Sequence, residues 1–277
     1  MTRDACNPTP PDLTHAQQVS PSKATSAVSA GSRPAAVVFD VDGTLVDSER
    51  DGHRVAFNQA FADLGLPYQW GEQEYGGLLE ITGGRSRLDA YLRRRGHSDE
   101  EADTLARTLH AQKTALFVAS CQAGEVPARP GAARLLGELA DERVPVAIAT
   151  TGSRAWVEPL LDHLFGLKRF AFVLTGDEVG DRKPDPAVYL DSLARLGTPP
   201  GGTVAVEDSR NGLLAASAAG LPCLVVVNGY TIDHDLTGAA LVVDCFGQPG
   251  HAAVLAGAPD LLDAGAVTVA TLTRLTR

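Results

Sequence analysis

Residues 35–45 read AAVVFDVDGTL, and this stretch decides the fold. It begins with five apolar residues and ends in two aspartates, Asp40 and Asp42, followed by Gly43. A short run that is apolar throughout is typical of a strand buried on both faces, as strands are in a parallel sheet. Such sheets bind ligands just beyond the carboxyl ends of their strands, and Gly43 lets the backbone turn tightly there. We therefore predict a parallel sheet with a functional site at Asp40 and Asp42.

The Asp-x-Asp-Gly pattern has more than one interpretation. Two nearby carboxylates raise each other's pKa unless a cation neutralises them, and Mg2+ is the first candidate because it prefers oxygen ligands. A plain polar turn gives the same pattern. A calcium loop of the EF-hand type would need further acids and a glutamate at its twelfth place, which here is Asp51. The motif alone leaves the metal site and the plain loop open.

Length and composition limit the function. The chain has 277 residues, of which 44% are hydrophobic, enough for one large domain or two smaller ones with a substantial core. Its formal net charge of -10 argues against nucleic acid or an anionic membrane surface as a partner. No stretch approaches the length of a membrane span. The cysteines are far apart and have no metal-binding spacing, which fits a reducing cytoplasm; they are Cys6, Cys121, Cys223 and Cys245.

Two segments differ from the rest of the chain. Residues 1–33 carry many Pro, Ser, Thr and Ala and few large apolar side chains, so we predict a disordered tail. A transit peptide is the alternative, but such peptides are poor in acids, and Asp4 and Asp12 lie in this segment. Residues 47–128 have helical patterns and form a predicted all-helical cap domain, with Ser48 as the cap of the first helix. The predicted helices end near 64, 79, 95 and 121.

From residue 129 onward, strand and helix patterns alternate. This alternation predicts a parallel sheet with helices on both faces. We therefore predict an α/β protein whose Rossmann-like parallel sheet core comprises residues 34–46 and 129–277, interrupted after its first strand by the cap. The predicted strands are 144–149, 170–174, 203–206, 223–227 and 240–243, and the predicted helices are 132–141, 154–165, 186–196 and 210–219.

Polar residues follow several of these strands. Thr150 opens the run 150–153, where a hydroxyl and free N–H groups suit a phosphoryl oxygen or simply cap a helix. Lys183 is followed by Pro184 and Pro186, which stiffen its loop, and it either supplies a fixed positive charge or belongs to a solvated turn. Glu207 and Asp208 are costly after a buried strand unless they are paired, metal-bound or capping a helix. Together, these residues converge on one crevice at the carboxyl edge of the sheet.

This ordered set resembles the four motifs of the haloacid dehalogenase-like hydrolase superfamily: an Asp-x-Asp, a Thr or Ser, a Lys and an acidic pair. The resemblance covers about residues 35–247, and the helical insert is placed like the cap of the β-phosphoglucomutase-like branch. Finer features resemble the CbbY-like group, although the run 47–53 is one residue longer than usual and Arg154 replaces a small or amide residue. The segments that carry this likeness are 53–58, 81–85, 176–179 and 207–212.

The resemblance implies a phosphatase that acts through an aspartyl-phosphate intermediate. It implies that Asp40 is the nucleophile and that Asp42 protonates the leaving oxygen and then activates water. It also implies that Thr150 and Lys183 hold the phosphoryl oxygens. The implied Mg2+ ligands are Asp40, Asp42 through its backbone carbonyl, and Asp208, with Glu207 nearby.

The CbbY-like group acts on sugar bisphosphates, notably xylulose 1,5-bisphosphate, and a second phosphate needs a second anion site. Guanidinium groups match phosphate in a bidentate way, so Arg85 is the first candidate, ahead of Arg87 and Arg154. Each of these arginines is otherwise a solvated surface residue. Glu49 and His53 either contact sugar hydroxyls or lie at the hinge. The other expected substrate contacts are Gly83, Gly84, Thr151, Gly152 and Ser153.

Other functions remain open on the sequence. A β-phosphoglucomutase-type isomerase would use the same core, and a phosphoglycolate phosphatase is a third candidate. A non-catalytic binding protein on this fold is the alternative from another class, since fold does not determine function. The intact acidic and basic motif residues argue against that alternative. We expect a cytoplasmic monomer that acts on a small phosphorylated sugar and binds neither nucleic acid nor membranes.

Overall fold

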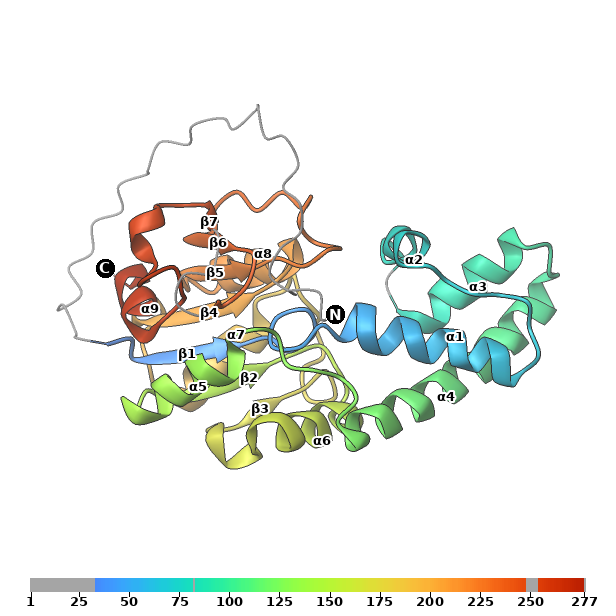
Figure 1. The fold of residues 1–277 in the computed structure, drawn as a ribbon, viewed down its shortest axis with the longest axis horizontal. Helices are drawn as coiled ribbons and strands as arrows, with labels where there is room; N and C mark the ends of the chain where they lie inside the picture. The colour runs from blue at the N-terminus through green and yellow to red at the C-terminus, as the bar shows by residue number, and fades with distance from the viewer. Residues whose placement is uncertain (1–32, 82, 248–253, 277) are drawn as a thin grey trace.

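The computed structural model describes residues 33–81, 83–247 and 254–276. Nearly all of the tail predicted at 1–33 lies outside them. Figure 1 shows a sheet flanked by helices and, beside it, an elongated group of four helices, α1–α4. Within the described residues, no helix combines the length and apolar character needed to cross a membrane.

A seven-stranded sheet runs through the larger part, in the order β3-β2-β1-β4-β5-β6-β7. The neighbours of β1 are β2 and β4, both parallel to it, with Val37 opposite Val146 on one side and Val204 on the other. The predicted parallel sheet is confirmed, except that β7 runs antiparallel to β6. The strands are β1 Ala36–Phe39, β2 Val146–Ala149, β3 Val173–Leu174, β4 Thr203–Glu207, β5 Cys223–Val226, β6 Leu241–Val243 and β7 Val254–Ala256.

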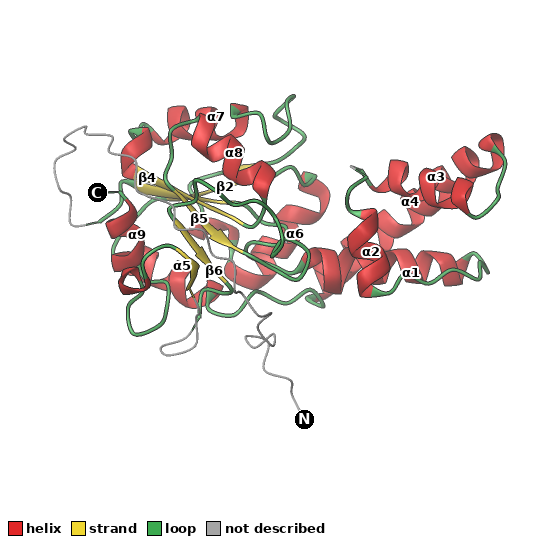
Figure 2. Ribbon diagram, turned by 90° about the horizontal axis from the view of Figure 1, so that it is seen from above, coloured by secondary structure: helices red, strands yellow, loops and turns green. Residues whose placement is uncertain are grey.

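Helices cover both faces of the sheet because its strands are apolar on both sides. Along β1, Val37 and Phe39 pack into one buried cluster and Val38 into another, as the two-residue period of a strand requires. The first cluster lies under α5, α6 and α9, and the second under α7 and α8 (Figure 2). These helices are α5 Ala132–Asp141, α6 Arg154–Phe165, α7 Ala187–Leu196, α8 Arg210–Ala218 and α9 Val269–Leu275.

The cap has its own core, which is largely aromatic. Rings of Phe57, Phe61, Trp70, Tyr75 and Tyr91 pack against one another within it. Its four helices match the predicted ones, and the exact division into a cap of residues 47–128 and a core stays a proposal. The helices are α1 Arg54–Asp63, α2 Glu72–Leu78, α3 Gly84–Arg94 and α4 Asp99–Ala123.

The segment before α1 differs from the prediction. Residues Glu49–His53 form a π-helical turn, η1, rather than the first turn of an α-helix. The hydrogen bonds of a π-turn span one more residue than those of an α-turn. Ser48 makes no side-chain cap bond there, and its predicted capping role is wrong. Gly52 fits because a Cβ at this position would lie 2.5 Å from the Phe117 ring of α4.

Arg129, in the segment that returns from α4 to the sheet, ties three parts of the core together. Its guanidinium is buried and donates to the carbonyl of Gly43 at 2.5 Å and to that of Val226 at 3.0 Å. It also donates to the carbonyls of Val227 at 2.6 Å and Asp244 at 2.7 Å. The loop that follows β1 is thereby joined to the ends of β5 and β6.

We expect Arg129→Met to lower the free energy of unfolding by about 3–5 kcal/mol, because four buried carbonyls lose their donor. Urea denaturation followed by circular dichroism measures this change. Arg107→Met is the matched control, since the Arg107 side chain is 56% exposed. Equal stability of the two variants would contradict the structural role of Arg129.

Candidate active site

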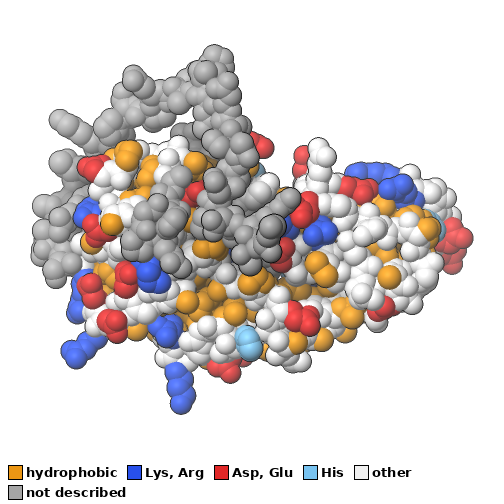
Figure 3. Space-filling view, in the orientation of Figure 1, with side chains coloured by type: hydrophobic (Ala, Val, Ile, Leu, Met, Phe, Trp, Pro, Cys, Tyr) orange, Lys and Arg blue, Asp and Glu red, His pale blue; other side chains and the backbone are white. Residues whose placement is uncertain are grey.

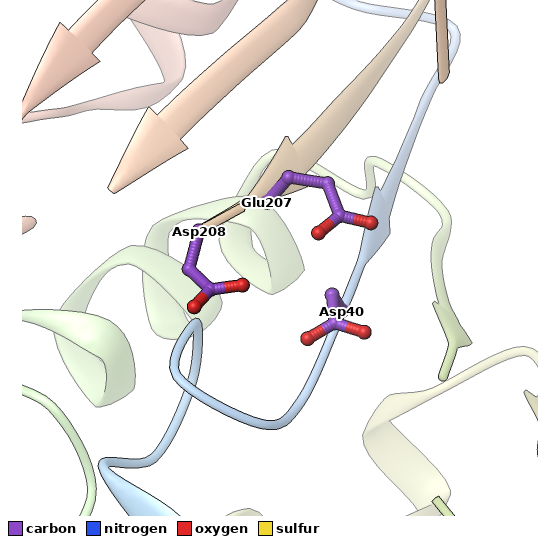
Figure 4. A group of neighbouring side chains, drawn as sticks. All are labelled: Asp40, Glu207 and Asp208. Carbon is purple, nitrogen blue, oxygen red and sulfur yellow. The ribbon is translucent and has the colours of Figure 1, made fainter. Parts of the chain in front are cut away.

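Three carboxylates meet at the carboxyl edge of the sheet, where the strand order reverses on either side of β1. Asp40 follows β1, Glu207 is the last residue of β4, and Asp208 comes next. All three are buried, and one carboxylate oxygen from each lies within 4.8 Å of the others. Figure 4 shows the side chains directed toward one another from the ends of the two strands. Ligands of open α/β sheets bind at such a switch point.

Lys183 joins this cluster from the loop before α7. Its Nζ donates to Asp40 Oδ1 at 2.7 Å and to the carbonyl of Ala149 at 2.8 Å, and it lies 2.6 Å from Glu207 Oε1. Burial favours the neutral amine, but the two carboxylates outweigh this effect and raise the pKa of Lys183. The ammonium group therefore stays charged and connects the ends of β1, β2 and β4.

Glu207 is held by groups that sequence reasoning did not identify. The hydroxyl of Tyr189, on α7, donates to Glu207 Oε1. On the other side, a Cβ at Gly212 would lie 1.9 Å from Glu207 Oε2, so only glycine leaves room for this carboxylate. The predicted metal ligand thus lies within the acidic cluster but is also bound to Lys183 and Tyr189.

Asp208 has a different surrounding. Asn228, which follows β5, donates from Nδ2 to Asp208 Oδ2 at 2.8 Å. A Cβ at Gly43 would lie 2.2 Å from the same oxygen, and the positive φ of 79° also favours glycine there. Burial, and then the charges of Asp40 and Glu207, raise the pKa of Asp208 well above its ordinary value. The charge of Arg129 and the hydrogen bond from Asn228 oppose this shift but do not outweigh it.

Asp42 faces the cap. Its Oδ1 accepts a hydrogen bond from Ser48 Oγ and lies 3.8 Å from His53 Nε2. Burial, and then the nearby charge of Glu49, raise the pKa of Asp42 to about 8, although a quarter of its side-chain surface is exposed. A carboxyl group that is protonated near neutral pH can give its proton to a leaving oxygen.

The loop after β2 approaches the same edge. Thr150 is buried, and its Oγ1 accepts the backbone N–H of Gly152 at 3.1 Å, while Ser153 precedes α6 without a side-chain cap bond. Thr151 is exposed. The guanidinium of Arg154 is bound by Glu158 and Glu178, so its positive charge is already compensated.

A second polar cluster lies on the inner side of the cap. Glu49 Oε2 accepts a 2.5 Å hydrogen bond from the Tyr75 hydroxyl, which in turn accepts one from Arg87 Nη1 at 3.0 Å. His53 Nδ1 lies 2.9 Å from the Nζ of Lys113, on α4. Burial, and then the charges of Lys113 and Arg87, lower the pKa of His53 well below its ordinary value. We conclude that this histidine is neutral near pH 7.

Lys113 was not identified from the sequence, although α4 carries a signal for it. The buried residues of this helix recur every three or four positions, and Lys113 occupies the place between Leu109 and Phe117 where an apolar residue is expected. Burial lowers its pKa to about 8, while Glu49 and Asp42 oppose this shift. The carboxylates of Glu49 and Asp42 are the negative charges near this buried ammonium group.

The structure separates the two arginines near the Gly83–Gly84 break. Gly83, with a positive φ of 90°, precedes α3, and Gly84 begins it. Arg87 is buried within the polar cluster of the cap, whereas the Arg85 side chain is 53% exposed and ion-paired with Asp103 at 2.7 Å. Binding of a second phosphate by Arg85 stays a prediction. The Arg85 side chain lies at the surface, outside the polar cluster that contains Arg87.

Figure 3 shows how charged side chains are distributed on one face of the molecule. On the face in Figure 3, basic and acidic side chains that are not grey are interspersed rather than gathered in one patch. Charged side chains gather closely at the sheet edge and on the inner side of the cap.

Comparisons with known proteins agree with this geometry. The model of the haloacid dehalogenase-like hydrolase family matches residues 34–220. The chain is 40% identical to Protein CbbY of Cereibacter sphaeroides, over 79% of this chain and 96% of that protein. It is 33% identical to a phosphoglycolate phosphatase of Photorhabdus laumondii, over 73% of this chain and 83% of that protein.

A solved structure is similar as well. It is a variant of CbbY from Rhodobacter sphaeroides in complex with xylulose 1,5-bisphosphate, with 39% identity and a TM-score of 0.67, covering 78% of this chain and 96% of that chain. The match extends over both the sheet and the helical part. The chain therefore belongs to the haloacid dehalogenase-like hydrolase family, in its CbbY-like group, and is a phosphatase.

Proposed function

We propose that the protein is a Mg2+-dependent sugar-phosphate phosphatase that acts through an aspartyl-phosphate intermediate, with xylulose 1,5-bisphosphate or a related sugar bisphosphate as substrate. The observation that carries this proposal is the buried Asp40 carboxylate, bound to Lys183 at 2.7 Å and flanked by Asp42. The sugar bisphosphate bound to the similar CbbY structure supports the substrate class.

The proposed reaction has two steps. Asp40 attacks phosphorus and the bond to the sugar oxygen breaks, while Asp42 gives that oxygen its proton. Water then attacks the aspartyl phosphate, Asp42 takes a proton from it, and the bond between Asp40 and phosphorus breaks to release phosphate. Thr150 and Lys183 hold the other phosphoryl oxygens, since positioning and charge compensation dominate phosphoryl transfer.

The acidic cluster fits a divalent cation. Its donors are carboxylate oxygens, which Mg2+ prefers, and three buried carboxylates lie here beside one ammonium group, that of Lys183. Asp40, Asp208 and the carbonyl of Asp42 would hold the ion, with Glu207 near it. When bound, Mg2+ neutralises charge between the nucleophile and the phosphoryl group.

The second phosphate has a proposed site on the inner side of the cap. Arg87 and Lys113 are the buried cations there, and both lie near Glu49 and His53, which can accept or donate hydrogen bonds to sugar hydroxyls. A buried guanidinium loses less on binding phosphate than an exposed one, because its water has already been removed. We therefore assign the distal phosphate to Arg87 and Lys113 ahead of Arg85.

Asp40→Asn should abolish phosphate release, because a neutral amide does not attack phosphorus. The variant should keep the wild-type circular dichroism spectrum, so loss of activity reports on chemistry rather than folding. Phosphate release from a sugar bisphosphate, measured in a coupled assay, is the readout. Substantial turnover by the folded variant would rule out Asp40 as the nucleophile.

Chelation of divalent cations should stop phosphate release, and added Mg2+ should restore it, because Asp40 and Asp208 require a cation between them and the phosphate. Asp208→Asn should raise the Mg2+ concentration needed for half-maximal rate. Elemental analysis establishes that the chelated sample is metal-free. Full activity of that sample would disprove the metal requirement.

Arg87→Ala should reduce kcat/KM for xylulose 1,5-bisphosphate about tenfold or more, and for phosphoglycolate much less, because one charged contact to the distal phosphate is lost. Arg85→Ala, two residues away on the same helix, is measured in parallel and should have the smaller effect. A larger loss of kcat/KM for Arg85→Ala than for Arg87→Ala would instead indicate that Arg85 binds the distal phosphate. Conversion of β-glucose 1-phosphate to glucose 6-phosphate with little free phosphate would favour the mutase function.

A further inference from the structure

The cap and the core meet at a contact that none of the motif residues makes. Tyr230 lies in the loop after β5, and its ring packs on Gly76 in the middle of α2. A Cβ at Gly76 would lie 3.0 Å from Cδ1 and 3.2 Å from Cε1 of the ring, whereas a Cβ at the next residue, Gly77, would meet no atom within 4 Å. The ring therefore lies against the bare backbone of α2 at one residue.

Hydrogen bonds connect each side of this contact to one of the two polar clusters of the site. On the core side, Asn228 Oδ1 accepts the N–H of Tyr230 at 2.9 Å, and Asn228 Nδ2 donates to Asp208 at 2.8 Å. On the cap side, Tyr75 precedes Gly76 and its hydroxyl binds both Glu49 and Arg87. A short series of contacts thus runs from the acidic cluster through Tyr230 and Gly76 to the polar cluster of the cap.

The position of the Tyr230 ring is determined by packing. Its hydroxyl is buried and has no hydrogen-bond partner among the described residues, and its ring centroid lies 6.0 Å from that of Tyr75 in an edge-to-face arrangement. A cavity of about 460 Å³ adjoins the contact. Its lining includes Asp47, which precedes η1, Arg50 of η1 and Glu72 of α2. Beside this cavity, Tyr230 brings the core into contact with α2.

We propose that Tyr230 is a positioning residue, on which α2 rests so that the cap cations lie at the correct distance from Asp40. This inference rests on the proposed function, because a substrate with two phosphates must span both clusters. A displacement of about 1 Å between such groups is enough to cost a large factor in rate. A Cβ at Gly76 already requires the ring to shift by a few tenths of an ångström, so a side chain as large as leucine would separate α2 from the ring.

The test compares Gly76→Leu with Gly77→Leu, a matched pair in the same helix with the same change in helix propensity. Gly76→Leu should lower kcat/KM for xylulose 1,5-bisphosphate about tenfold or more, chiefly through KM, while hydrolysis of p-nitrophenyl phosphate, which has no second phosphate, changes much less. Gly77→Leu should leave both kcat/KM for xylulose 1,5-bisphosphate and the hydrolysis of p-nitrophenyl phosphate unchanged. Small-angle scattering should show a larger radius of gyration for Gly76→Leu alone, because its cap is held away from the core.

A double variant separates a positioning role from general damage. Tyr230→Ala removes the ring, so adding Gly76→Leu to Tyr230→Ala should cost far less than adding it to the wild type, and the two effects should not add. Additive effects of Tyr230→Ala and Gly76→Leu on kcat/KM would overturn the proposal. Equal kinetics and equal scattering for Gly76→Leu and Gly77→Leu would overturn it as well. Neither result would affect the phosphatase activity of the wild type. If the wild type hydrolysed neither compound, the proposed function would fail, and the scattering comparison would still decide whether Tyr230 supports the cap.

Discussion

The ion pair between Lys183 and Asp40 is the interaction on which the rest of the active site depends. Parallel strands bring their carboxyl ends to one edge, and this chain ends two neighbouring strands in acids, so Asp40, Glu207 and Asp208 repel one another in a buried place. Lys183 binds two of these carboxylates and a carbonyl of the adjacent strand. Removing a partner from such a pair leaves an uncompensated buried charge, which costs several kcal/mol, roughly 3–5.

One ammonium group does not balance three carboxylates. The other buried cation in this region, Arg129, is occupied by four backbone carbonyls and supports the loop at Gly43. Asp208 accepts its side-chain hydrogen bond from the neutral amide of Asn228 rather than from a cation. This imbalance is the physical reason why a divalent cation suits the site, and the close approach of Asp208 to Gly43 keeps the carboxylate directed at Asp40.

The sequence predicted the sheet well, and it placed the acidic residues and Lys183 at one edge, because both predictions depend on local patterns. Apolar runs ending in polar residues mark buried strands, and their order places the motifs at one edge. It missed β7 and α9, which are short, and it assigned Ser48 to a helix cap although its hydroxyl binds Asp42. Supporting residues such as Arg129, Tyr189 and Tyr230 were also missed, because the partners of each lie on distant segments: Arg129 and Gly43, for example, are 86 residues apart.

The acidic cluster at the sheet edge and the polar cluster of the cap differ in charge. The core is acidic around a lysine and suits a metal ion and a phosphoryl group, which are common to many phosphatases. The cap is where this chain places its other buried cations, Arg87 and Lys113, beside a neutral His53. Because burial lowers the pKa of Lys113 to about 8, an anion bound there would stabilise its charged form, and binding and protonation would reinforce each other. Under the proposed assignment of the distal phosphate to the cap, a contact that sets the distance of the cap from the core would also affect selectivity among phosphorylated sugars.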